Sequence, residues 1–112
     1  MTQFSLIPDP TFSTTASIPR AGKEDGKLTF TFRHKTLDEL RVMDEKLQKG
    51  AEGKKSTVEP QADYLLEIVE AWALPDEFNR ENVITLLKNY PRAFDHIGLA
   101  YTKELMAIRE KN

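Results

Sequence analysis

The sequence lacks cysteine, and its other potential ligands are sparse. Without cysteine, disulfide bonds and thiolate metal sites are excluded in this chain of 112 residues. The only imidazoles are those of His34 and His96, which lie far apart in the sequence and outside any metal-binding motif. The five glycines are scattered, and none belongs to a phosphate-binding loop. We therefore expect no metal site and no cofactor.

Further absences bear on location and partners. No apolar run approaches the roughly 20 residues of a membrane helix, and residues 1–10 lack the basic start and apolar core of a signal peptide. Sixteen Lys and Arg residues oppose eighteen Asp and Glu residues, which gives a formal charge of -2 and no positive field to attract nucleic acid. We expect a cytoplasmic protein whose partners are neither membranes nor nucleic acids.

The sequence also offers no arrangement of groups suited to catalysis. Acid–base chemistry requires ionisable side chains in a shielded cleft, but carboxylates such as Asp38 and Glu39 fall on the polar faces of predicted helices. Residues 13–17 are rich in Ser and Thr but lie within a predicted strand, without the sharp turn that exposes a nucleophile. We interpret the chain as a non-catalytic protein with no catalytic residues.

Alternating polarity predicts a β-hairpin over residues 11–34. The side chains expected on one face are Phe12, Thr14, Ala16 and Ile18 from the first strand, and Leu28, Phe30, Phe32 and His34 from the second. Residues 19–26 contain two glycines and are suited to the reversal. Because a lone hairpin is marginally stable, its apolar face needs cover from helices or another chain. Its open edge also favours pairing with another copy, which predicts a homo-oligomer.

Four helices are predicted after the hairpin. The first spans residues 36–49, from a capping box at Thr36 to a left-handed residue at Gly50. A mobile loop over residues 50–58 follows, and residues 60–110 contain three helices. The second helix is predicted to end at Pro75, and its apolar stripe consists of Leu65, Ile68, Val69 and Trp72. Asn79 is predicted to cap the third helix, and Pro91 precedes the fourth.

These elements predict an α+β fold with an N-terminal β-hairpin followed by about four α-helices packed as a small bundle. Residues 1–112 would form a single domain, since two cores do not fit in a chain of this length. Residues 1–10 contain two prolines and form either an extended arm that docks on a neighbouring subunit or a frayed terminus.

Aromatic residues gather around two short breaks between the last three predicted helices. They are Trp72, Phe78, Tyr90 and Phe94, and such side chains serve either in the core or as anchors for a partner. Trp72 and Leu74 stand just before Pro75, at a helix end where not every face can be buried. We predict that these four aromatic residues bind a protein partner.

A pattern within residues 72–93 resembles the small tail assembly chaperones of tailed bacteriophages. It consists of Trp72, Asp76-Glu77-Phe78, Glu81-Asn82, Leu86-Leu87, Asn89-Tyr90-Pro91 and Ala93. The N-terminal part resembles the same family, through Phe12 in a short strand, the second strand at residues 28–34 and the acidic start of the helix from Thr36. The resemblance covers most of the chain except residues 50–58.

This resemblance implies a protein made during virion morphogenesis that binds the tape measure protein, with tail tube subunits as a second candidate client. Such a chaperone keeps its clients soluble and is absent from the finished particle, and some members also exist as a frameshifted longer product. Two alternatives remain open. One is a structural tail or joining component that is retained in the virion, and the other is a host-directed regulatory protein that binds a bacterial enzyme.

Overall fold

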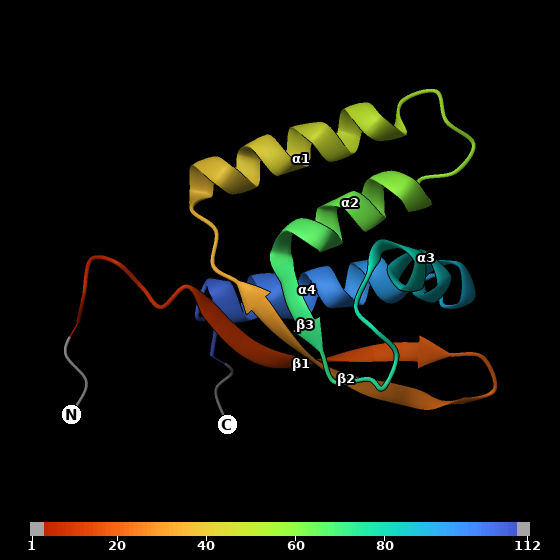
Figure 1. Ribbon diagram of the computed structural model, residues 1–112, viewed down its shortest axis with the longest axis horizontal. Helices are drawn as coiled ribbons and strands as arrows, with labels where there is room; N and C mark the ends of the chain where they lie inside the picture. The colour runs from red at the N-terminus through yellow and green to blue at the C-terminus, as the bar shows by residue number, and fades with distance from the viewer. Residues whose placement is uncertain (1–3, 110–112) are drawn as a thin grey trace.

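The computed structural model describes residues 4–109, in which three strands and four helices form one sheet with helices on one side (Figure 1). The elements are β1 (Thr11–Arg20), β2 (Lys23–Arg33), α1 (Leu37–Ala51), α2 (Val58–Ile68), β3 (Val69–Trp72), α3 (Arg80–Asn89) and α4 (Ala93–Leu105). The predicted α+β class and the four helices are confirmed. Packing as a small bundle is not confirmed, because α4 and α2 cover the sheet while α1 lies on α2.

The predicted hairpin is present, and its two faces differ as the alternation required. β1 and β2 pair antiparallel, with Phe12 opposite Phe32 and Ala16 opposite Leu28 on the buried face. On the opposite face, the hydroxyl groups of Thr15 and Thr29 lie 2.7 Å apart and are exposed to solvent. The strands therefore bury one face against the helices and leave a Ser/Thr-rich face open.

The turn between β1 and β2 is shorter than the predicted reversal over residues 19–26. Only Ala21 and Gly22 separate β1 from β2, and Gly22 adopts a positive φ of 72°. Gly26 lies within β2 opposite Ile18, beside an irregularity in the register. The left-handed conformation at Gly22 permits the turn, since a residue with a Cβ atom rarely adopts it.

The prediction that the second helix continues to Pro75 is wrong. α2 ends at Ile68, and β3 pairs antiparallel with β2, placing Trp72 opposite Phe30. The Ala73 amide extends this ladder by donating to the Thr29 carbonyl at 2.9 Å. An unpaired strand edge offers a row of hydrogen-bonding groups, and β-branched and aromatic residues fit a strand well. The free edge of β2 thus captures a segment whose side-chain spacing also suits a helix.

The predicted starts of two helices are confirmed, and one predicted end is wrong. Thr36 and Glu39 form the reciprocal capping box of α1, with hydrogen bonds of 2.8 and 3.2 Å, and the Asn79 side chain accepts from the Asn82 amide at 2.8 Å. α1 continues through Gly50, and the left-handed glycine is Gly53 instead, with a φ of 66°.

Gly50 has a different role, in the packing of α1 on α2. A Cβ atom at Gly50 would lie 3.1 Å from the Pro60 side chain, so glycine allows a close approach of the two helices. The connection between them is shorter than the predicted loop, because α1 extends to Ala51 and α2 begins at Val58. The predicted mobility of this loop stays a prediction.

The centre of the core is an aromatic cluster between the sheet and α4. The Tyr101 ring lies 5.0 Å from that of Phe32 and 5.6 Å from that of Phe12, between ring centroids. Its hydroxyl group donates to the Arg33 carbonyl at 2.8 Å, so the buried phenol is satisfied. This contact joins α4 to the end of β2 and fixes the helix along β1.

The pairing of β3 can be tested with two substitutions at one exposed position. Ala73→Pro removes the amide that donates to Thr29, and we expect a loss of about 1 kcal/mol in the free energy of unfolding. Ala73→Val keeps the amide and should change stability by less than about 0.5 kcal/mol. Chemical denaturation of both variants measures the difference, and equal stabilities would show that the ladder does not extend to Ala73.

The buried phenols predict a loss of stability at alkaline pH. Burial raises the pKa of Tyr64 to about 12, with a further contribution from the Asp44 carboxylate, and burial also raises the pKa of Tyr101. An unfolded tyrosine ionises near pH 10, so the unfolded chain releases these protons first. The stabilising contribution is complete below about pH 10 and is lost as the pH rises towards about 12.

Denaturation of wild type and Tyr64→Phe at about pH 9 and pH 11 tests this linkage, because the variant lacks one of the shifted groups. We expect the variant to lose less stability between the two pH values than wild type does. Parallel losses in the two proteins would contradict a role for Tyr64.

Candidate binding surfaces

A groove with a largely apolar wall opens between the hairpin end of the sheet, the end of β3 and α3. Its volume is about 340 Å³. The apolar lining consists of Ile18 and Leu28 from the hairpin, Trp72 and Leu74 from β3 and the segment after it, and Leu86 and Tyr90 from α3 and its end. We call it the Trp72 groove. The cationic residues Arg20 and Lys27 line its hairpin side, and Asp76 lies on the segment between β3 and α3.

Trp72 is held in place by contacts within its own chain. The indole Nε1 donates to the Asp76 carbonyl at 2.8 Å, and the indole ring meets the Phe78 ring edge-on at 5.1 Å between centroids. Pairing with Phe30 in the sheet fixes its backbone. The side chain is half-buried and needs no partner to satisfy its donor, so one wall of the groove is formed before any ligand arrives.

Three of the four predicted site residues come together, and one does not. Trp72 and Tyr90 line the Trp72 groove, and Phe78 supports Trp72 through its ring contact. Phe94 instead packs against Tyr64, with ring centroids 5.7 Å apart, and is not part of the groove lining. All four are half-buried and contact the core. Their binding of a partner stays a prediction.

The groove contains residues that the sequence analysis did not predict as binding residues. Ile18 and Leu28 belong to the buried face of the hairpin, and Leu86 to the apolar stripe of α3. Each reads as an ordinary core position, and only the packing of α3 near the hairpin end places them in one groove. Leu74 did carry a signal, because it stands at the end of an apolar stretch just before Pro75.

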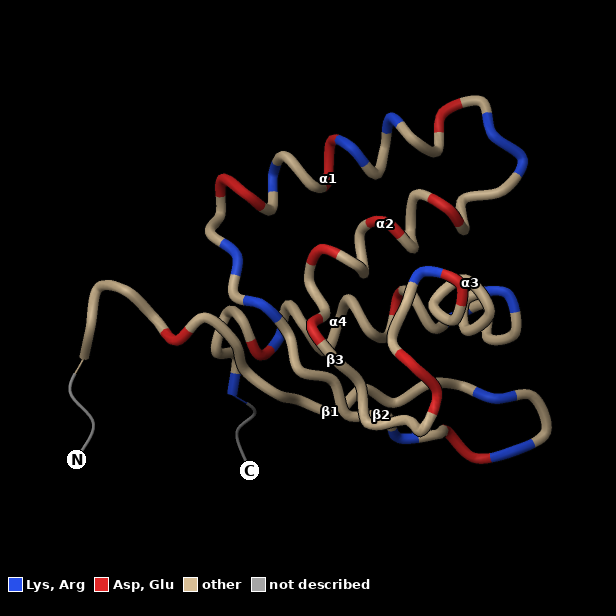
Figure 2. The backbone as a smooth tube through the Cα atoms, in the orientation of Figure 1, with Lys and Arg blue, Asp and Glu red and all other residues tan. Residues whose placement is uncertain are grey.

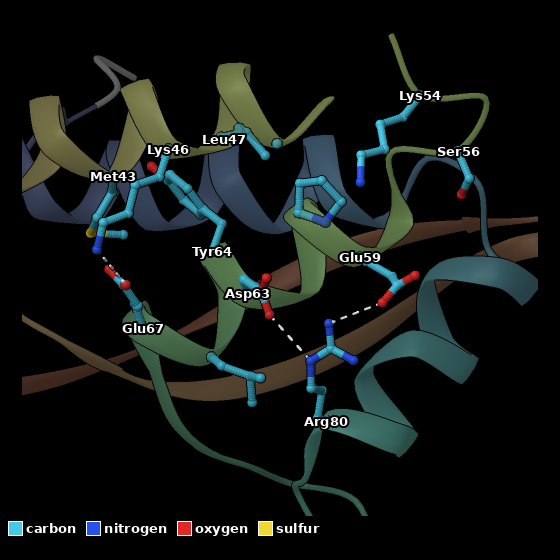
Figure 3. Close-up of a pocket in the computed structure, with 13 residues that line it drawn as sticks. Met43, Lys46, Leu47, Lys54, Ser56, Glu59, Asp63, Tyr64, Glu67 and Arg80 are labelled. Atoms are coloured by element: carbon cyan, nitrogen blue, oxygen red, sulfur yellow. Dashed lines mark hydrogen bonds and ion pairs between the residues drawn. The ribbon is translucent and has the colours of Figure 1, made fainter. Parts of the chain in front are cut away.

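A larger groove of about 610 Å³ lies between α1 and α2 (Figure 3). Its apolar lining includes Met43, Leu47 and Tyr64. Five of its six charged lining residues form ion pairs with one another: Arg80 lies 3.2 Å from Asp63 and 3.5 Å from Glu59, and Lys46 lies 3.6 Å from Glu67. Figure 3 shows Arg80 pointing from α3 toward both carboxylates of α2.

These ion pairs decide which partners each groove suits. Exposed ion pairs contribute little to the free energy of unfolding, and their charged groups remain hydrated. An apolar partner that filled the groove between α1 and α2 would have to remove water from several of them at a free-energy cost. The smaller Trp72 groove has fewer charges to desolvate, so size alone does not identify the apolar binding site.

Charged positions are concentrated on the helices and the hairpin end, and the middle of the hairpin carries none (Figure 2).

Within residues 4–109, no three or more His, Asp or Glu side chains are grouped to hold a metal ion. The histidines occupy separate settings: His34 donates its amide to the Pro10 carbonyl, and His96 lines a groove of about 650 Å³ between β1 and α4. None of the described helices combines the length and the apolarity that crossing a membrane demands.

Residues 4–10, which we call the N-terminal arm, project away from the sheet and contain no helix or strand (Figure 1). The side chains of Phe4, Leu6 and Ile7 are 91%, 90% and 80% exposed. The amide of His34 donates to the Pro10 carbonyl at 2.9 Å, which fixes the base of the arm to the end of β2. The described part of the arm contains bends at Leu6, Ile7 and Pro10, so the extended, docked arm stays a prediction, and residues 1–3 lie outside the described range.

Comparison with known proteins gives one informative result. No protein with a curated description and no solved structure matches the sequence. A family described as phage tail assembly chaperone matches residues 1–112, the whole chain. The match includes the pattern in residues 72–93, which builds much of the Trp72 groove, and the N-terminal strands. This chain therefore belongs to the phage tail assembly chaperone family.

Proposed function

We propose that this chaperone binds the tape measure protein in the host cytoplasm and keeps it soluble while the phage tail assembles. Membership of a chaperone family implies a role in binding and not in catalysis. The observation that carries the choice of client surface is the Trp72 groove, an apolar depression of about 340 Å³ that no described part of the chain fills. Tail tube subunits are a second client of the same kind.

The chemistry of the groove fits a client that exposes apolar side chains along a helix. An amphipathic helix binds a groove through side chains three and four residues apart, while its polar face stays in water. Trp72, Leu74 and Tyr90 provide a partly preformed apolar wall for such side chains. The indole and phenol rings offer large contact areas with few rotatable bonds, which lowers the entropy lost on binding.

The size of the groove limits how much client one copy covers. About 340 Å³ lies near the lower end of ligand-binding pockets, which span roughly 300–1,000 Å³. It holds a few side chains, equivalent to one or two turns of a client helix. A long client with a continuous apolar stripe would therefore require several chaperone copies along its length.

Charges at the groove would orient the client. Arg20 and Lys27 line the hairpin side, and Asp76 lies on the segment before α3. Opposite charges beside an apolar centre set the direction of a bound helix and favour clients with complementary charges. Such charges affect specificity and association rate more than affinity.

Co-expression with the tape measure protein tests this surface. We expect Trp72→Ala, Tyr90→Ala and Leu74→Asp to lower the amount of soluble tape measure protein, because each removes or charges part of the apolar wall. Loss of one such anchor should weaken binding by roughly tenfold or more. The measurement is the soluble fraction of the client relative to that obtained with wild-type chaperone.

Two control variants make the experiment selective. Leu99→Asp changes an apolar residue that is 65% exposed on α4, outside the Trp72 groove, and should leave client solubility unchanged. Phe94→Ala tests the predicted site residue that lies elsewhere. If folded groove variants keep the client soluble, or if Phe94→Ala alone reduces its solubility, the groove is not the client site.

A further inference from the structure

The N-terminal arm carries the three most exposed large apolar side chains of residues 4–109. Phe4, Leu6 and Ile7 are 91%, 90% and 80% exposed and lie within four consecutive residues. Isolated apolar residues on a surface are ordinary, but a cluster on a projecting segment typically marks a contact with another molecule. These three side chains are therefore free to contact an apolar surface of another molecule.

The geometry prevents Leu6 and Ile7 of the arm from reaching the Trp72 groove of their own chain. The arm joins β1 at Thr11, and the groove begins at Ile18, seven residues along the strand or about 23 Å away. Leu6 is five residues from Thr11, so even a fully extended chain that turned back would carry it only about 18 Å. The arm also points away from the groove end of the sheet (Figure 1).

We propose that the arm of one copy inserts into the Trp72 groove of a second copy. Phe4, Leu6 and Ile7 would then contact the apolar wall that includes Trp72 and Leu74. Docking would straighten the bends at Leu6 and Ile7, and in the resulting extended segment these neighbouring side chains would point to opposite sides and engage different walls. The contact would link two copies through two apolar surfaces, the arm and the groove, that are both exposed in a single copy.

Charge and stiffness support this pairing. The arm contains one charged residue, Asp9, and the groove has Arg20 and Lys27 on its hairpin side. Arg20 donates to the Glu24 carbonyl, and Lys27 donates to the Ser17 hydroxyl group. Neither residue forms an ion pair with a carboxylate within residues 4–109. Prolines at positions 8 and 10 fix their own φ angles and disfavour helical backbone at Ile7 and Asp9, which reduces the entropy lost when the arm docks.

The arm and the groove lie toward opposite ends of β1, so each copy has one donor and one acceptor surface. Two copies side by side could exchange arms, and further copies could join in a row. If the groove also holds the client, which rests on the proposed function above, then client and arm compete for it. Self-association would store the free chaperone with its apolar surfaces covered.

Complementary variants test the contact directly. Leu6→Asp disables the arm and keeps the groove, whereas Leu74→Asp disables the groove and keeps the arm; both residues are exposed, and circular dichroism verifies folding. Light scattering at roughly tens of micromolar measures mass in a range where contacts of about micromolar Kd form. Wild type and the control Leu99→Asp should self-associate. Each disabling variant should dissociate with a Kd raised at least roughly tenfold.

The decisive sample is an equimolar mixture of the two disabled variants. One intact arm and one intact groove remain, so the mixture should form a one-to-one heterodimer although neither variant self-associates. The proposal is overturned if wild type is monomeric, if Leu6→Asp still self-associates, or if the mixture stays monomeric. Binding of the tape measure protein to Leu6→Asp is measured in a separate experiment. If the mixture forms the heterodimer but Leu6→Asp does not bind the tape measure protein, the client assignment is rejected and the contact between arm and groove stands.

Discussion

Pairing between β2 and β3 joins the C-terminal half of the chain to the N-terminal hairpin. The antiparallel ladder sets Trp72 opposite Phe30 and continues to the amide of Ala73. The chain then turns through residues 73–79, and α3 begins at the Asn79 cap. This path brings the side chains of α3 near the hairpin end of the sheet, where they complete the Trp72 groove. Without the pairing, the groove would lose its central wall.

The sheet has only one apolar face, and this limits where the molecule can bind apolar partners. The buried face packs against α4 and α2, with Tyr101 at the centre of the contact. The opposite face is rich in Ser and Thr and already wetted. Apolar surface remains at the Trp72 groove, on the N-terminal arm and at separate helix positions such as Leu37 and Leu99. A chaperone needs such a restricted display, because a larger exposed patch would promote its own aggregation.

The helix starts and the hairpin could be predicted from the sequence, because they depend on interactions between residues that are close in the sequence. The capping residues Thr36 and Asn79 act within three residues, and the alternation of the hairpin reflects one buried face. β3 could not be recognised in this way. Leu65, Ile68, Val69 and Trp72 have helical spacing, but the strand forms because β2 has a free edge, and that edge is distant in sequence.

The candidate site shows the same division between local and distant information. Trp72, Phe78 and Tyr90 are brought together as their clustering in the sequence suggested, whereas Phe94 turns toward Tyr64 on α2. Ile18 and Leu86 could not be assigned to the groove, since their contribution depends on how α3 packs near the hairpin. The arm was open to two interpretations from sequence, a docking arm or a frayed terminus, and its exposed side chains are the basis of the proposed docking.

Because Trp72 is the only tryptophan of the chain, its fluorescence reports on the groove directly. The central claim is that client side chains enter this groove, so we predict that titration of the Leu6→Asp variant, whose groove no arm fills, with tape measure protein segments shifts the Trp72 emission to shorter wavelength in a saturable manner. A client labelled with a separate dye would report binding independently. Binding seen by the dye without any change in Trp72 emission would contradict the account.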